Sequence, residues 1–249
     1  MKKIVVLFFL LVFCFPAYAK EDTNWHNEGM KYLKNNEYVS AINAFSKAME
    51  EGDVLHNQYH RGAAYVLNKE SHKGLRDLKA AETAFPCFFW LHYYKYLGHN
   101  DLKEYEKSKQ DCAMMIKIDP RTNYGYHGLG FIALREKNYV VALENTVKAL
   151  KISPNAGSYN NLGQIYIGLE EYELAVKSFD KAIVLDSKYN ALYYNKAIVL
   201  EKMGEKEKAM ENYELFLEKA DNYDSYQTVM KKDHLVKNAR KKIAKLGGK

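Results

Sequence analysis

The sequence has little proline, few cysteines and no long apolar run. Its 249 residues include four prolines and three cysteines. The longest unbroken apolar stretch, Ile4–Phe15, has 12 residues, whereas a helix that crosses a bilayer needs about 20. This stretch is therefore too short to form a permanent membrane-spanning helix.

Motifs of common catalytic sites are missing as well. The chain has no Gly-x-Ser-x-Gly, no glycine-rich phosphate loop and no His-Glu-x-x-His. His56 and His60 lie one helical turn apart and could face one metal ion, but a stable site needs further ligands. Nothing nearby in the sequence supplies them at a clear spacing. We therefore predict no catalytic site, no metal site and no cofactor.

The first residues, 1–19, have the pattern of a bacterial signal peptide. Two lysines precede the apolar run, and Ala17-Tyr18-Ala19 has the small-x-small form of a cleavage site. We expect cleavage after Ala19 and a periplasmic or secreted protein. The alternative is a lipoprotein anchored through Cys14, although bulky Phe13 stands where a lipobox needs a small residue.

Small residues recur at a fixed interval in the second half of the chain. Gly130 and Gly163 are 33 residues apart, and so are Ala142 and Ala175. A glycine inside a helix costs about 1 kcal/mol relative to alanine. It is usually kept because a neighbouring helix must approach closely at that point. The interval therefore predicts repeated pairs of closely packed helices.

This pattern resembles the tetratricopeptide repeat, which recurs about every 34 residues. In the clearest copy, the residues that carry the resemblance are Tyr159, Leu162, Gly163, Tyr166, Ala175, Phe179 and Ala182. The resemblance implies an all-α solenoid of about six helix–turn–helix units over 22–221. The expected units lie near 22–54, 55–88, 89–121, 122–155, 156–188 and 189–222.

Two units depart from the family pattern. Unit two has Gly74 where alanine is usual, and unit three has Tyr96 in place of the family's glycine.

A last helical stretch, 225–246, is expected to cap the open end of the solenoid. The cysteines beyond the signal, Cys87 and Cys112, occupy positions that do not favour a disulfide, because one lies in a loop and the other in mid-helix.

Positive charge is concentrated at the C-terminus. Lys231–Lys249 holds eight basic residues and one acid, Asp233, while the whole chain carries a net charge of +6. The predicted capping stretch therefore accounts for the excess of basic over acidic residues in the chain. This charge either forms a solvated outer face that keeps the open end of the solenoid soluble, or it attracts an anionic surface such as phospholipid headgroups. No base-reading motif accompanies it, so nucleic acid is not an expected partner.

The resemblance also implies where a partner would bind. Members of this family bind peptides along the concave surface formed by the first helix of each unit. Asn27, Asn161 and Asn195 occupy one repeat position, where a row of asparagines could hold the backbone of a ligand. Alternatively, these asparagines only face water. The candidate partner-binding residues are Asn27, Tyr124, His127, Phe131, Arg135, Asn160, Asn161, Gln164, Tyr194 and Asn195.

One binding mode of the family is not expected in this chain. The lysine and asparagine that form a clamp for carboxylate termini are replaced by His26 and Met30. The sequence as a whole predicts a non-catalytic adaptor of the cell envelope that binds a protein or peptide. The alternative is a membrane-surface or cell-wall tether that acts through the basic C-terminal helix. Nothing in the sequence fixes the oligomeric state.

Overall fold

The computed structural model describes residues 24–221 and 229–247. These residues form thirteen helices, and no strand occurs among them, which confirms the predicted all-α solenoid. The signal peptide and the first part of the predicted cap, 225–228, lie outside the described residues. The helices are α1 Asn24–Lys34, α2 Tyr38–Glu51, α3 Val54–Leu67, α4 Ser71–Glu82, α5 Phe89–Asp101, α6 Tyr105–Ile118, α7 Tyr124–Arg135, α8 Tyr139–Ile152, α9 Ala156–Gly168, α10 Tyr172–Leu185, α11 Ala191–Lys202, α12 Lys206–Asp221 and α13 Val229–Gly247.

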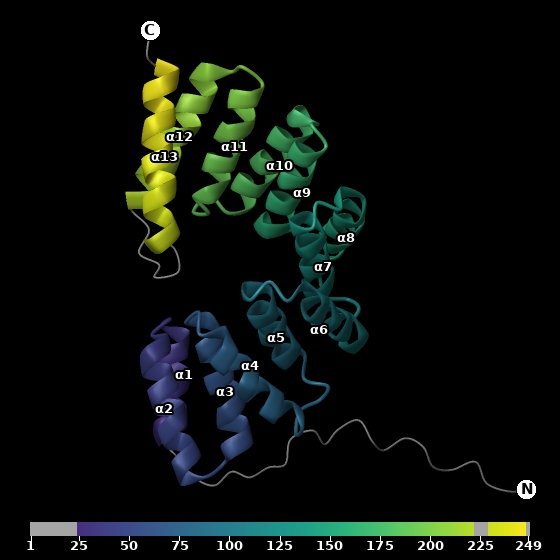
Figure 1. Cartoon of the computed structure of the whole chain (residues 1–249), viewed down its shortest axis with the longest axis vertical. Helices are drawn as coiled ribbons and strands as arrows, with labels where there is room; N and C mark the ends of the chain where they lie inside the picture. The colour runs from purple at the N-terminus through teal and green to yellow at the C-terminus, as the bar shows by residue number, and fades with distance from the viewer. Residues whose placement is uncertain (1–23, 222–228, 248–249) are drawn as a thin grey trace, which may run out of the picture.

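Successive helices pair as hairpins that follow a curved path. Each odd-numbered helix from α1 to α11 packs against the next even-numbered one, and each of these hairpins packs against its neighbours. In Figure 1 the first and last hairpins lie on the same side of the view, and α7 and α8 lie on the other. Among the described residues, no helix combines the length and apolar character that crossing a membrane would require.

The same turn closes each of the six hairpins. Its central residue has a left-handed backbone, with φ between 59° and 81°. The next residue donates its N–H to the carbonyl oxygen five positions earlier, over 2.8–2.9 Å. This is the Schellman arrangement, which ends one helix and starts the next within a few residues. The left-handed residues are Asn36, Lys69, Lys103, Lys137, Glu170 and Gly204.

A contact between residues 16 positions apart holds each hairpin together. In unit five a methyl group on Gly163 would lie 2.6 Å from Phe179 Cε1, and in unit one Gly29 meets Phe45 in the same way. In unit four a methyl group on Gly130 would lie 2.6 Å from Thr146 Oγ1. These glycines therefore stand where the second helix approaches closely, as the sequence predicts.

Unit three keeps this contact with the sizes exchanged. Tyr96 takes the place of the glycine, and its partner 16 residues later is the small Cys112. Both are buried in one cluster with Met115 and Ile132. Ser108 Oγ also donates to the carbonyl oxygen of Tyr96 over 3.0 Å, so the two helices still approach closely. Cys112 is thus a packing residue, and both it and the exposed Cys87 are free thiols.

Unit two is packed even more tightly. A methyl group on Gly74 would lie 2.7 Å from the carbonyl oxygen of Gly62 and 2.9 Å from the backbone nitrogen of Val66. The alanine that the family usually has at this position would therefore meet backbone atoms of α3. The two glycines allow α3 and α4 to touch through their backbones.

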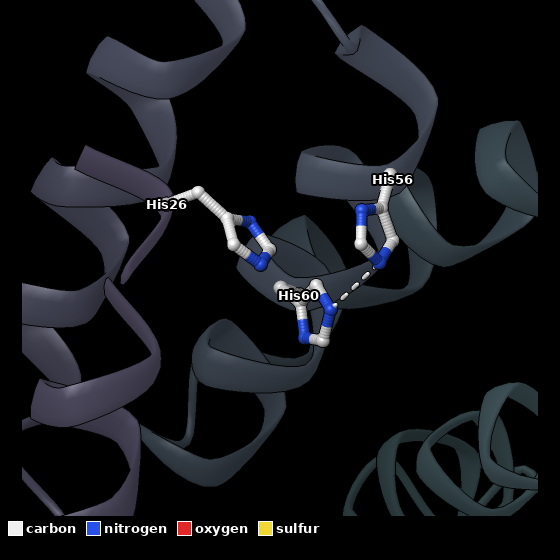
Figure 2. A group of neighbouring side chains, drawn as sticks. All are labelled: His26, His56 and His60. Atoms are coloured by element: carbon white, nitrogen blue, oxygen red, sulfur yellow. Dashed lines mark hydrogen bonds between the residues drawn. The ribbon is translucent and has the colours of Figure 1, made fainter. Parts of the chain in front are cut away.

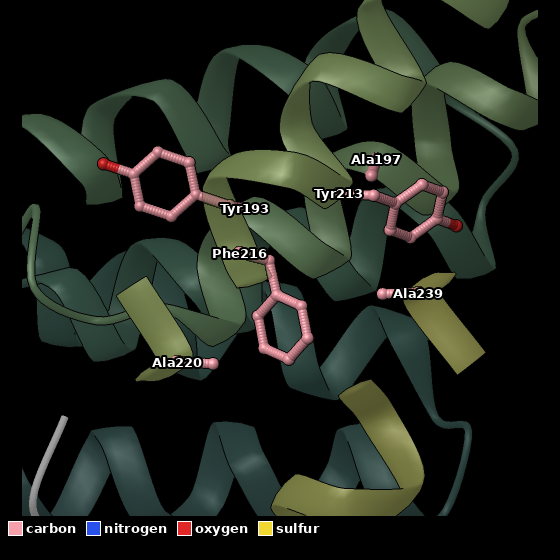
Figure 3. Close-up of a cluster of buried hydrophobic side chains, with 6 residues drawn as sticks. All are labelled: Tyr193, Ala197, Tyr213, Phe216, Ala220 and Ala239. Atoms are coloured by element: carbon pink, nitrogen blue, oxygen red, sulfur yellow. The ribbon is translucent and has the colours of Figure 1, made fainter. Parts of the chain in front are cut away.

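Helix α13 covers the last hairpin. Ala239 is fully buried in one cluster with side chains of α11 and α12, among them Tyr213 and Phe216 (Figure 3). Lys242 Nζ also lies 2.7 Å from Glu201 Oε1 on α11. The apolar face of α13 therefore stabilises the exposed end of the solenoid by removing that apolar surface from water.

The left-handed turns provide a test of this account. An L-residue with a side chain pays roughly 1 kcal/mol for this conformation, whereas glycine does not. Lys137→Gly should therefore raise the free energy of unfolding by about 0.5–1 kcal/mol in urea titrations. The matched control is Lys151→Gly in the right-handed last turn of α8, which should lower it by about 0.5–1 kcal/mol. Equal destabilisation by both changes would contradict the turn assignment.

Candidate functional site

The first helices of the hairpins form one continuous surface. Helices α1, α3, α5, α7, α9 and α11 each contact the next one in this series. Residues about one repeat apart on these helices can therefore meet across neighbouring units. This is the surface on which the resemblance places partner binding.

The predicted binding residues differ in how accessible they are. Asn27, Tyr124 and Arg135 are exposed, whereas Asn160 and Asn161 are buried. The half-buried residues are His127, Phe131, Gln164, Tyr194 and Asn195.

Three aromatic side chains gather where α5 meets α7. Tyr124 lies edge-on to Trp90 and Tyr93, with ring centroids 5.5 and 5.3 Å away. Trp90 and Tyr124 keep 42% and 40% of their surface exposed. We call Trp90, Tyr93 and Tyr124 the aromatic patch. Large, rigid rings of this kind are common at the centres of protein interfaces.

Of the patch residues, the sequence predicts a binding role only for Tyr124. The first helix of unit three departs from the family pattern at Tyr96, and this departure hides the role of its aromatic residues. A usable indication was present, because Trp90 precedes Tyr124 by 34 residues, one repeat length.

The asparagines of α9 and α11 are arranged unequally. Asn195 Nδ2 donates to Asn160 Oδ1 over 2.9 Å, so these two side chains satisfy each other across neighbouring units. Asn161 is only 3% exposed, and its Nδ2 group has no hydrogen-bond partner. An unpaired buried donor costs about 1–3 kcal/mol. Asn161 thus differs from Asn160 and Asn195 in having a buried amide donor that no group of the protein satisfies.

Two other predicted residues make contacts within the protein. The ring of Tyr194 lies 5.5 Å from Tyr213 and 5.2 Å from Phe216, both on α12, so it packs toward the second helix of its own unit. His127 Nδ1 lies 3.0 Å from Ser158 Oγ on α9. Burial lowers the pKa of His127, so its imidazole is neutral at neutral pH. The role of these residues in binding stays a prediction.

Three histidines meet between α1 and α3, at the N-terminal end of the same surface (Figure 2). His26 comes from α1, and His56 and His60 come from α3; each offers a ligand atom, and these atoms lie within 4.8 Å of one another. The Nε2 atoms of His56 and His60 are 3.2 Å apart. Burial, followed by the neighbouring His56 and His26, lowers the pKa of His60 to about 3.

The sequence predicts no metal site here, because His56 and His60 alone are too few ligands for a stable site. The third imidazole comes from the preceding unit: His26 lies 30 residues before His56 and 34 before His60. Such separations bring residues together only when the first helices of consecutive units lie side by side. The fold thus adds a third imidazole that spacing along one helix could not indicate.

Comparison with known proteins agrees with the geometry. Residues 156–189 and 191–222 match models described as tetratricopeptide repeat. The chain is 27% identical over 147 residues to anaphase-promoting complex subunit 3 of Schizosaccharomyces pombe, covering 59% of this chain and 22% of that protein. It is also 27% identical over 198 residues to Hsp70-Hsp90 organizing protein 3 of Arabidopsis thaliana, covering 76% and 35%. The chain thus spans about a fifth to a third of the length of these relatives.

Solved structures show the same fold. The structure of the APC/C hetero-tetramer Cut9-Hcn1 superimposes with a TM-score of 0.72 at 17% identity, covering 86% of this chain and 42% of that one. A TPR protein of Thermus thermophilus superimposes with a TM-score of 0.62 at 15% identity, covering 71% and 97%. The chain therefore carries tetratricopeptide repeats and has the all-helical fold of a tetratricopeptide-repeat solenoid.

Proposed function

We propose that this protein is a non-catalytic adaptor that binds a peptide or an extended segment of a partner protein on the surface of its first helices. The observation that carries this proposal is the aromatic patch. Exposed tryptophan and tyrosine rings held rigidly against one another offer a large apolar contact at little cost in side-chain entropy. The matching relatives, one of which is named for organising Hsp70 and Hsp90, support protein binding as the general role.

Asn161 adds a polar contact to the same surface. Its buried Nδ2 donor would bond to a backbone carbonyl of an extended ligand once the side chain turns outward, which would remove the penalty of an unsatisfied buried group. The aromatic patch would provide most of the affinity, and the amide would set the position of the ligand's backbone. This division of roles fits the common form of peptide sites, with apolar anchors and a few oriented polar groups.

The site of action is proposed to be the bacterial cell envelope. The proposal rests on the signal-peptide pattern of residues 1–19, with cleavage after Ala19 and lipidation at Cys14 as the minor alternative. In the envelope a solenoid of this kind would help to assemble or hold together a protein complex.

Peptide selection tests the binding surface. Peptides selected from a displayed library on the wild-type protein should bind the double variant Trp90→Ala, Tyr124→Ala at least tenfold more weakly in fluorescence anisotropy. Loss of a central aromatic anchor typically costs about 2 kcal/mol or more. The variant Asn161→Ala, Asn195→Ala should also bind more weakly, with its helicity unchanged.

The control for this experiment is Val140→Ala. Val140 lies on a second helix, α8, and is 77% exposed, so its loss should leave affinity unchanged. Undiminished affinity of the Trp90, Tyr124 double variant would reject the aromatic patch as the binding site. Undiminished affinity of the asparagine double variant would reject the role of Asn161.

A second candidate function is attachment to an anionic surface through α13. Lys237, Arg240, Lys241 and Lys245 are exposed on this helix, whereas Lys242 is engaged by Glu201. A group of exposed lysines and arginines is attracted to anionic lipid headgroups by about 1 kcal/mol for each charge near the surface. The packing of α13 on α12 would hold this basic face at one end of the solenoid.

Vesicle sedimentation tests this tether. Binding to vesicles that contain phosphatidylserine should fall steeply between about 0.1 and 0.5 M salt, because salt screens charges at the surface. Changing Lys237, Arg240 and Lys241 to glutamate should abolish it. The matched control changes the exposed Lys103, Lys117 and Lys137 to glutamate, with the same change in net charge. Equal loss in both variants would mean that net charge, and not α13, governs binding.

A further inference from the structure

We propose that His26, His56 and His60 form a binding site for a divalent transition-metal ion such as zinc. The three imidazoles offer ligand atoms that all lie within 4.8 Å of one another. In Figure 2 the rings point toward a common centre between α1 and α3. Imidazole nitrogen is a preferred ligand of zinc, copper and nickel, whereas magnesium and calcium prefer oxygen.

The neighbours of the histidines fix which nitrogen is available. His26 Nδ1 lies 2.8 Å from Asn57 Oδ1, and Asn57 Nδ2 donates to the carbonyl oxygen of Asp53 over 3.0 Å. This second bond orients the amide of Asn57 so that its oxygen accepts from His26 Nδ1–H. His26 Nε2 therefore carries the lone pair that an ion would use.

His56 is held in the same tautomer. Its Nδ1 lies 3.1 Å from Asp53 Oδ2, and a carboxylate oxygen accepts the Nδ1 proton. His56 Nε2 therefore also carries a lone pair and faces His60 Nε2 across 3.2 Å. A carboxylate behind a metal-binding imidazole is the usual outer-shell support, because it orients the ring and raises its basicity. Asp53 gives this site that support.

The distances suit an ion after a small adjustment. Zinc binds imidazole nitrogen at about 2.0–2.1 Å, so two ligand nitrogens can be no more than about 4.2 Å apart. The Nε2 atoms of His56 and His60 already meet this limit. Without an ion, His60 Nε2 carries the proton of this contact. When the ion binds, that proton moves to His60 Nδ1, so that His60 Nε2 can also bind the ion, and His26 turns inward. Three protein ligands leave a fourth position of a tetrahedral site open.

The site lies where an ion would stabilise the solenoid. Among the described helices α1 is the first, and its contacts are with α2 and α3. A metal bound by one imidazole from α1 and two from α3 would tie the first unit to the second. It would act at the N-terminal end as α13 acts at the C-terminal end. A ligand that binds only the folded state raises stability with its concentration.

Metal titration tests the proposal. The full chain, purified without a histidine tag and stripped of metal, should bind one equivalent of zinc in calorimetry. Cobalt(II) should give the visible absorption bands of a tetrahedral complex. His26→Ala and His56→Ala should each weaken binding at least tenfold and remove the rise in melting temperature that zinc produces. Asp53→Asn should weaken binding by about tenfold or more through loss of outer-shell support.

Matched controls separate this site from adventitious binding. His72 is exposed on α4 outside the cluster, and His72→Ala should bind zinc as the wild type does. His56 is half-buried, with 43% of its side chain accessible, so His56→Ala should keep the wild-type circular dichroism without metal. Absence of a one-to-one complex would overturn the proposal. So would unchanged binding by His26→Ala and His56→Ala, or an equal loss in His72→Ala.

Discussion

Each hairpin depends on one contact between its two helices, made by residues 16 positions apart. The partners are complementary in size: glycine meets phenylalanine in units one and five, tyrosine meets cysteine in unit three, and alanine meets tyrosine in unit six. Protein interiors are close-packed, so a large side chain on one helix requires a small one opposite. Units two and four pair glycine with leucine and threonine. What recurs from unit to unit is that at least one partner is small, while the size of the other varies.

The stacking of successive hairpins has a consequence for the binding surface. The first helices of neighbouring units lie side by side, because each contacts the next one in the series. Residues about one repeat length apart in sequence then meet in space. This relation brings Trp90 to Tyr124, Asn160 to Asn195 and His26 to the two histidines of α3. The surface features proposed to bind a peptide and a metal ion all arise from it.

The sequence was sufficient to predict the fold class and the reason for the helical glycines. It was also sufficient to show that unit three is unusual, because Tyr96 stands in the glycine position. It did not reveal that Cys112 compensates for Tyr96, since size complementarity appears only when the two helices are seen together. The left-handed turns were equally hidden, because five of the six residues there are not glycine.

The functional residues were harder to predict than the fold. The candidate residues lie in units four to six, apart from Asn27 in unit one, at positions one turn apart on the first helices. Trp90 and Tyr93 of the aromatic patch lie in unit three, where Tyr96 departs from the family pattern. The histidine cluster joins units one and two, which spacing along a single helix does not relate. Tyr194 and Asn195 illustrate the opposite problem. Their repeat positions suggest a groove, but their side chains make contacts within the protein.

A double-mutant cycle on unit three tests the size-complementarity claim most directly. Tyr96→Gly alone leaves a cavity and should destabilise by about 3–5 kcal/mol, while Cys112→Phe alone overpacks and should cost about 1–3 kcal/mol. The two changes together recreate the glycine–phenylalanine pair of units one and five. Urea unfolding should then show that the double variant loses at least about 1 kcal/mol less than the sum of the single changes. Simple additivity of the two losses would contradict the claim.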